Sequence, residues 1–430
     1  MRSHHGQRRF ADLIHWPHLL ACATVMSVMA ICLSCSNSTT EAEGQAQQKK
    51  TPGKAPEILE IPSGNLTANW RAELSLGQTQ PKAIYVNDDK VLLYTSDNKC
   101  IWLNRASGHI VSITRAARST DRLHAPCTLA DRVVFPSTSE LAVFDRNGKQ
   151  MHRIPLRYGA SSGAVGEGRR IYLGEDHPNG GRIAAMDTGP HPYDITPEWE
   201  GMTRGQVSAA PAIYQGLVFA GSRDGGVYAL RGENRDNLWP GLDVGYFKTD
   251  GEILADLQAD KDGVYVCSMD SKLYCLDINT GRVRWTYYAG RPLREDSSPV
   301  PTANFVYLYV PQTGVVAIDK SGKQETRTAK WVYARGRQFL SSDDKYAYVR
   351  AEDNSIVAID KQNGQPRFAS RRKDFGVFAT NSTPKDSNIY ACTPGGMLYS
   401  VRAVLKPGTV GEWVALPPFE YHRSEEVASN

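Results

Sequence analysis

The chain has 430 residues, of which 41% are hydrophobic and 22% are charged, with 37 glycines and 24 prolines. This is the composition of a globular protein, and it excludes collagen-like, low-complexity and multi-span membrane chains. The formal net charge is only +4. Because no block of five or more basic residues occurs, the sequence predicts no nucleic-acid partner.

The first residues predict an export signal. Arg2, Arg8 and Arg9 precede an uncharged run from Trp16 to Cys35, which is the order of a basic segment followed by an apolar one. The run ends in Leu-Ser-Cys before polar sequence and so resembles the lipobox of bacterial lipoproteins, which implies lipidation of Cys35. A retained membrane-spanning helix is the alternative, because the apolar run is only a few residues short of the roughly 20 that span a bilayer.

A polar tether is expected after the signal, because the segment that follows Cys35 is rich in Ser, Thr, Glu, Gln, Lys and Pro and buries too little apolar surface to fold. The chain then divides into four parts: a lipoprotein-type signal peptide (1–34), a lipidated Cys with a flexible tether (35–65), a folded domain (66–416) and a C-terminal tail (417–430). Such a protein would be exported and anchored to a membrane through its lipid.

Five cysteines remain after the signal and the lipidated residue are set aside, and an odd number cannot all pair. Cys267 and Cys275 flank an expected hairpin and could form a disulfide, or they could be small buried thiols on strands. The sequence does not decide between these two states.

A repeat of about 42 residues runs through the folded domain and determines its architecture. Each copy contains an apolar strand, a polar turn, a second strand that ends in Asp or its counterpart, a Gly-containing turn and a third strand that carries Trp. The eight counterparts are Asn104, Asp145, Asp187, Arg231, Asp277, Asp319, Asp360 and Arg402.

Each copy alternates β-branched and aromatic residues with a period of two, as in Val306 to Val310, and a helical period is nowhere sustained. Eight such copies predict an all-β fold, an eight-bladed β-propeller of four-stranded antiparallel blades, with a seven-bladed ring as the less favoured alternative. Trp70 and Trp413 lie in additional outer strands before the first copy and after the last, and either strand could close the ring.

The best copy resembles the A-x-D-x-x-T-G-x-x-x-W repeat of the quinoprotein-type (PQQ-like) β-propeller family, because it reads Cys275-Leu-Asp277-Ile-Asn-Thr280-Gly281-Arg-Val-Arg-Trp285. The copies at Asp319 and at Asp360, Gly364 and Phe368 keep part of the pattern. We expect structural roles for these residues: the Asp caps the turn, the Gly takes a left-handed conformation, and the Trp packs between blades.

No catalytic or metal-binding motif accompanies the repeat. The histidines are scattered, and no spacing of His and Cys fits a zinc site. The resemblance also includes quinone-dependent dehydrogenases, but these carry an adjacent Cys-Cys pair and large insertions that build a calcium and quinone pocket. Both features are absent here, so we expect no catalytic residue, no bound pyrroloquinoline quinone (PQQ) and no metal.

The resemblance extends to the BamB family of lipoproteins, which serve the outer-membrane β-barrel assembly machinery as scaffolds. It implies a non-enzymatic, lipid-anchored protein at the periplasmic face of the outer membrane that binds protein partners, with that machinery as the partner that the resemblance suggests. The alternative is an exported propeller that binds a small ligand or a glycan in its axial funnel, or a degenerate quinoprotein enzyme. Arg291, Arg294, Arg335 and Arg337 are the candidate loop residues for a ligand or a partner, and solvated surface loops are their simplest interpretation.

Overall fold

The structure is a computed structural model that describes residues 63–64, 66–189, 197–370, 372–383, 386–403 and 422–423. Two units divide the chain, Met1–Ile58 and Leu59–Asn430. The expected signal peptide, Cys35 and Trp413 lie outside the described residues. The second unit contains every described element.

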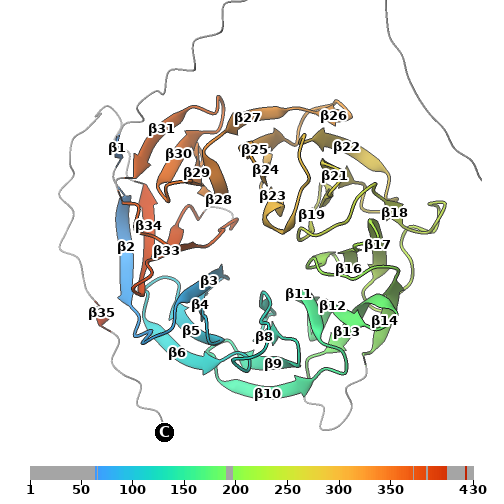
Figure 1. The fold of residues 1–430 in the computed structure, drawn as a ribbon, viewed down its shortest axis with the longest axis horizontal. Coiled ribbons are helices and arrows are strands. Elements are labelled where there is room, and N and C mark those ends of the chain that lie inside the picture. Colours follow the sequence, from blue (N-terminus) through green and yellow to red (C-terminus); the bar gives the residue numbers. More distant parts are fainter. Residues whose placement is uncertain are drawn as a thin grey trace, which may run out of the picture. The chain divides into compact units, whose positions relative to one another are not determined.

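The second unit is a ring of eight antiparallel sheets around a central axis (Figure 1), so the predicted eight-bladed all-β propeller is confirmed. Each blade has four strands, and its first strand lies nearest the axis. Blade 1 consists of β3 (Pro81–Val86), β4 (Lys90–Thr95), β5 (Lys99–Asn104) and β6 (Ile110–Arg115), and blade 2 of β7 (Cys127–Thr128), β8 (Arg132–Pro136), β9 (Glu140–Asp145) and β10 (Gln150–Pro155). Blade 3 consists of β11 (Ala160–Glu167), β12 (Arg170–His177), β13 (Gly180–Asp187) and β14 (Trp199–Thr203), and blade 4 of β15 (Ala212–Tyr214), β16 (Leu217–Gly221), β17 (Gly226–Arg231) and β18 (Phe247–Lys248).

Blades 5 to 8 follow the same plan. Blade 5 consists of β19 (Gln258–Asp260), β20 (Gly263–Cys267), β21 (Lys272–Leu276) and β22 (Val283–Tyr288), and blade 6 of β23 (Val300–Pro301), β24 (Phe305–Val310), β25 (Gly314–Asp319) and β27 (Ala329–Tyr333). Blade 7 consists of β28 (Gly336–Ser342), β29 (Tyr346–Ala351), β30 (Ile356–Asp360) and β31 (Pro366–Ser370), and blade 8 of β32 (Val377–Phe378), β33 (Ile389–Cys392), β34 (Met397–Ala403) and β2 (Leu66–Glu73). A 3-10 helix, η1 (Glu295–Ser297), precedes β23. Short parallel strands extend three blades: β1 (Ser63–Gly64) on β31, β26 (Thr326–Arg327) on β22 and β35 (His422–Arg423) on β2.

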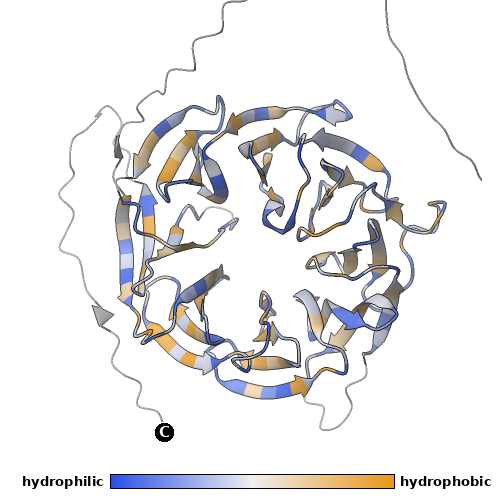
Figure 2. Cartoon of the chain, viewed as in Figure 1, coloured by the Kyte–Doolittle hydropathy of each residue, from blue (hydrophilic) through white to orange (hydrophobic). Residues whose placement is uncertain are grey.

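The middle strands of the blades are buried on both faces. β8 and β20 have no exposed residue, and Figure 2 shows apolar stretches on strands between the axis and the rim of the ring. The reason is that each blade packs its two faces against its two neighbours: Cys267 and Leu273 of blade 5, for example, share a core cluster with Val306 and Leu308 of blade 6. Alternation in the sequence therefore identified strands correctly, although burial does not alternate along them.

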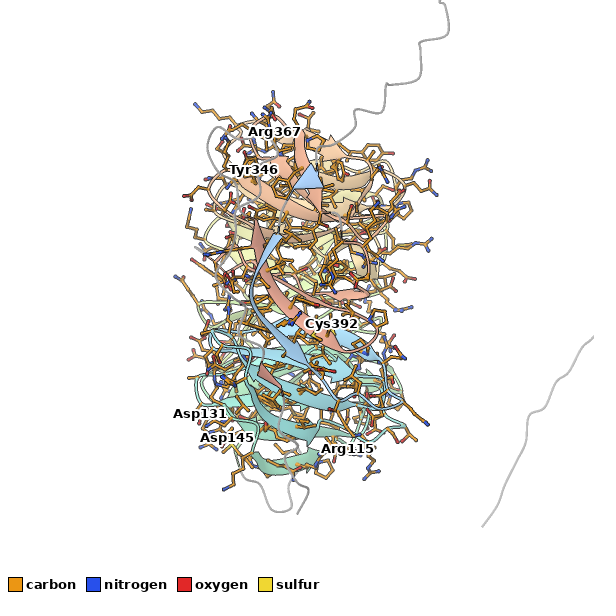
Figure 3. All side chains as sticks on the ribbon, turned by 90° about the vertical axis from the view of Figure 1, so that its left-hand side faces the viewer. Arg115, Asp131, Asp145, Tyr346, Arg367 and Cys392 are labelled. Atoms are coloured by element: carbon orange, nitrogen blue, oxygen red, sulfur yellow. The ribbon has the colours of Figure 1, made fainter. Side chains whose placement is uncertain are left out.

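The ring is closed by β2, which pairs antiparallel with β34, so that a strand from the N-terminal side completes blade 8. This is the strand of Trp70, one of the two that the sequence offered. Figure 3 looks at this side of the ring, with Cys392 of blade 8 between Tyr346 and Arg367 of blade 7 and Arg115 of blade 1. Pairing the first outer strand with the last blade removes an open sheet edge.

A repeated hydrogen bond joins successive blades. The donor is the indole Nε1 of a Trp that lies on or near the outer strand of one blade. The acceptor is a backbone carbonyl of the next blade, in the residue directly after the Asp of the repeat or its counterpart (the repeat position). The pairs are Trp70 with Arg105 (2.8 Å), Trp199 with Gly232 (2.9 Å), Trp239 with Ile278 (2.8 Å) and Trp331 with Lys361 (3.1 Å). In blade 2, His152 Nε2 lies 2.9 Å from the equivalent carbonyl oxygen of Thr188.

The five cysteines among the described residues are free and buried. Cys267 lies opposite Leu273 and Cys275 lies opposite Tyr265, so the two thiols do not face each other across the hairpin. The disulfide alternative is therefore wrong, and both residues act as small apolar side chains. Burial raises the pKa of the Cys275 thiol to about 12, which makes it a poor nucleophile.

Candidate functional site

The repeat residues lie in the turns between the third and fourth strands. Asp277 Oδ1 accepts hydrogen bonds from the backbone N–H of Asn279 (3.1 Å) and Thr280 (3.0 Å) and from the Thr280 hydroxyl (3.0 Å). Such an Asx turn fixes the backbone locally. Gly281 has a φ of 69°, and an added Cβ there would lie 2.5 Å from Trp239 Cδ2 of the preceding blade.

The partial copies of the repeat behave in the same way. Asp319 accepts from the Ser321 backbone N–H (2.8 Å), and Asp360 accepts from that of Gln362 (3.0 Å). Two further repeat residues pack in the interior: Trp285 is buried beside Tyr265, and Gly364, with a φ of 72°, lies against Trp331. These contacts hold turns and blades together, and none of them presents a reactive group.

The four candidate arginines do not converge on one site. Arg291 and Arg294 are exposed, and Arg335 is exposed with its Nη2 3.8 Å from Asp353 Oδ2. Only Arg337 lines an axial cavity, where its Nη2 lies 2.8 Å from Glu352 Oε1. The charge-rich segment that begins at Arg291 contributes its acidic end instead, because Glu295 and Asp296 line the same cavity.

This axial cavity has a volume of about 710 Å³ and lies among blades 5 to 8, on η1, β19, β23, β24, β28 and β29. The ionisable residues of its wall are Asp256, Glu295, Asp296, Arg337, Arg350 and Glu352. Its size is that of small-molecule sites in proteins. Carboxylates outnumber guanidinium groups in this wall.

Arg350 is the distinctive charge of the cavity and was not found from the sequence. Its Nε donates to Asn354 Oδ1 (2.9 Å), and its guanidinium lies 5.2 Å from the centre of the Phe378 ring. No described carboxylate forms an ion pair with it. Burial, and secondarily the positive charge of Arg337, lower the pKa of Arg350, so this cation lacks a compensating anion.

Asp256 is a half-buried acid of the cavity. Its Oδ1 accepts from the backbone N–H of Ala210 at 2.8 Å, while burial raises the pKa of its carboxyl group. Desolvation favours the neutral acid.

A second cavity, of about 880 Å³, is lined by the turns after the inner strands, and one of its cations, Lys320, is held by two Asp side chains. Lys320 Nζ lies 2.5 Å from Asp260 Oδ2, 2.8 Å from Asp262 Oδ2 and 3.0 Å from the Thr302 carbonyl oxygen. The hydrogen bond from Lys320 lowers the pKa of Asp262. Because Lys320 has its partners inside the protein, this cavity offers less to an incoming ligand than the first.

The outer surface of blades 1 and 2 carries exposed apolar side chains. Val111 and Ile113 of β6 are 37% and 50% exposed, and Met151 of β10 is 46% exposed. The two outer strands lie next to each other, since the Ser112 hydroxyl donates to the Asn147 carbonyl (2.8 Å) and Arg153 Nη2 donates to the Arg115 carbonyl (2.6 Å). We call Val111, Ile113 and Met151 the outer patch. Outer strands of other blades also expose single apolar side chains, such as Met202 and Val332, and the outer patch combines such residues from two neighbouring blades.

Neither a metal site nor a membrane-spanning helix occurs in the described part of the chain. No group of three or more His, Cys, Asp or Glu side chains there could hold a metal ion, and no helix there is long and apolar enough to cross a bilayer.

The eight blades, the Asp-capped turns and the Trp contacts between blades define a β-propeller built from PQQ-type repeats. A family model described as outer membrane protein assembly factor BamB matches residues 137–370, more than half of the chain. The chain therefore belongs to this family. No curated protein matches the sequence.

Solved structures show the same fold at low sequence identity. BamB from Moraxella catarrhalis is 17% identical with a TM-score of 0.58, over 79% of this chain and 98% of that one. The computationally designed Ika8 protein is 16% identical with a TM-score of 0.57, over 77% and 99%. A quinohemoprotein alcohol dehydrogenase, ADHIIG from Pseudomonas putida HK5, is 11% identical with a TM-score of 0.56, over 83% and 78%. The fold thus occurs both in an assembly factor and in a redox enzyme.

Proposed function

We propose that this protein is a non-enzymatic scaffold that binds protein partners through the outer patch and takes part in outer-membrane protein assembly. Its membership of the BamB family supports this role. In the proposed form the protein is lipidated at Cys35 and held at the periplasmic face of the outer membrane. A rigid ring whose surface residues vary freely suits such a role, since function in propellers resides in the surface and not in the repeat.

The outer patch is the observation that carries the proposal. Ile113 and Met151 are 50% and 46% exposed on neighbouring outer strands of two blades, and apolar side chains that lie together on a surface are suited to contact with a protein partner. A protein partner would remove this apolar surface from water, at roughly 25 cal/mol per Å².

The same proposal includes no bound quinone. PQQ carries three carboxylates and would need a cationic pocket with a metal ion. The axial cavity instead places the exposed carboxylates of Glu295, Asp296 and Glu352 beside Arg337 and Arg350. Because these carboxylates would repel the three carboxylates of PQQ, the wall is poorly suited to that cofactor.

A crosslinking pull-down from membranes tests the proposal. The wild-type protein should recover proteins of the β-barrel assembly machinery, and Cys35→Ala should lose them because the protein is no longer anchored. The double variant Ile113→Asp with Met151→Asp should lose them while remaining at the membrane. Met202→Asp is the matched control, because Met202 is 48% exposed on an outer strand of blade 3. Full recovery by the double variant would contradict a role for the outer patch.

A further inference from the structure

The axial cavity contains an unpaired cation next to unpaired acids. The guanidinium of Arg350, on β29, has hydrogen-bond and ring contacts but no carboxylate partner within the described residues. A half-buried guanidinium is costly unless an anion accepts its hydrogen bonds. Arg337 does not relieve this, since it carries the same charge and is itself bound to Glu352.

Glu295 and Asp296 supply the opposite charge to the same cavity. They lie exposed on η1, and neither forms an ion pair with a described cation. Although Arg350 and these acids line one cavity, they do not neutralise each other by direct contact. A ligand that carries both charges would therefore satisfy groups that the protein leaves unpaired.

The rest of the wall is suited to a compact organic body. Pro299, Val300, Pro301, Leu308 and Phe339 line the cavity, and apolar side chains with a few polar groups are the usual construction of a small-ligand site. The volume of about 710 Å³ admits a molecule the size of a dipeptide. A polyanion does not fit, because it would have to approach Glu295, Asp296 and Glu352.

We propose that the axial cavity binds a small zwitterion of the dipeptide class, with its carboxylate on Arg350 and its ammonium group at Glu295 and Asp296. This is a small-ligand site in addition to the scaffold role, and it depends neither on the outer patch nor on lipidation. The guanidinium fork can hold a carboxylate through two parallel hydrogen bonds, which a lysine in its place cannot do.

The first experiment is equilibrium dialysis of the purified full-length protein against an equimolar pool of dipeptides with free ends. The dipeptide that is retained most strongly is then titrated calorimetrically, together with its C-terminal amide and its N-acetyl derivative. We expect the free dipeptide to bind about tenfold or more tightly than either derivative, because each derivative removes one charge-assisted interaction.

Three variants locate the two charges. Arg350→Gln should abolish the preference for the free carboxylate over the amide, and the double variant Glu295→Gln with Asp296→Asn should abolish the preference for the free amine over the acetylated form. Arg335→Gln should keep both preferences, because Arg335 is exposed and does not line the cavity.

Each preference is the ratio of two affinities measured on the same variant. A modest loss of stability in that variant lowers both affinities alike and leaves the ratio unchanged. Retention of no dipeptide by the wild-type protein would overturn the proposal. An unchanged preference for the free carboxylate in Arg350→Gln would overturn it as well. Either result would leave the scaffold role standing, since that role is tested by the outer patch.

Discussion

Replacing Gly281 by alanine tests how tightly neighbouring blades are packed. Gly281 has a φ of 69°, and an added Cβ would lie 2.5 Å from Trp239 Cδ2 and 3.0 Å from Leu242 Cδ1. The substitution therefore has two costs. The alanine must adopt a left-handed backbone, and the Trp239 ring must move from the position in which its Nε1 donates to the Ile278 carbonyl at 2.8 Å.

The magnitude follows from these two costs. A left-handed alanine costs roughly 1 to 2 kcal/mol, and forcing extra volume into a packed interface costs about 1 to 3 kcal/mol. We expect Gly281→Ala to lower the free energy of unfolding by about 3 kcal/mol in total. Gly168→Ala is the matched control, since Gly168 has a φ of 64° and nothing lies within 4 Å of the added Cβ. It should lose only the backbone part.

Urea unfolding of the full chain, followed by far-UV circular dichroism, measures both variants. The reasoning also predicts that Gly281→Ala costs only about 1 kcal/mol in a Trp239→Ala background, because the ring that it displaces is gone. If Gly281→Ala and Gly168→Ala destabilise the protein equally, the contact between the blades is not what the glycine preserves.

Three further predictions concern single side chains. Tyr94→Phe should raise the free energy of unfolding by about 1 kcal/mol. The buried Tyr94 hydroxyl has no hydrogen-bond partner among the described residues, so no hydrogen bond offsets the cost of removing it from water. A lower urea midpoint in this variant would contradict the prediction. Arg105→Gln should lower the free energy of unfolding by about 3 kcal/mol, measured in the same way, because Arg105 of blade 1 forms a largely buried ion pair with Asp386 of blade 8. Burial, and secondarily Arg122, lower the pKa of His124 to about 4. Protonation therefore favours the unfolded chain, and stability should fall as the pH drops from about 6.5 to 4, by at most about 3 kcal/mol; His124→Gln should flatten this pH profile.

The blade count could be predicted because the repeat position marks the same strand in every blade. Asn104, Asp145, Asp187, Arg231, Asp319 and Asp360 each end the third strand of their blade, and Asp277 follows directly after β21. Spacing alone recovers this, since every blade needs the same length of chain. Degenerate copies therefore did not hide the architecture.

The innermost strands and the axial cavity could not be predicted in the same way. β7, β23 and β32 contain two residues each, too few to show a period. The cavity combines side chains from Asp256 to Ser382, and its notable feature is that Arg350 has no carboxylate partner among the described residues. That absence is a property of the folded molecule. The four arginines chosen from the sequence were chosen for local charge, and charge alone does not distinguish a surface loop from a binding site.

The hydrogen bonds between blades explain why the repeat is degenerate and yet holds one fold. The acceptor is always a backbone carbonyl, which every residue supplies, so its position is fixed by the turn and not by side-chain identity. At the five junctions with this bond a ring N–H of the preceding blade is the donor, whereas the outer strand of blade 7 carries Phe368, which has no ring N–H. His152 can take the place of a Trp because its Nε2, when protonated, donates to the Thr188 carbonyl as the indoles do elsewhere. At these junctions the contact between blades therefore depends on a donor and on the turn, and the residues of the outer patch take no part in these hydrogen bonds.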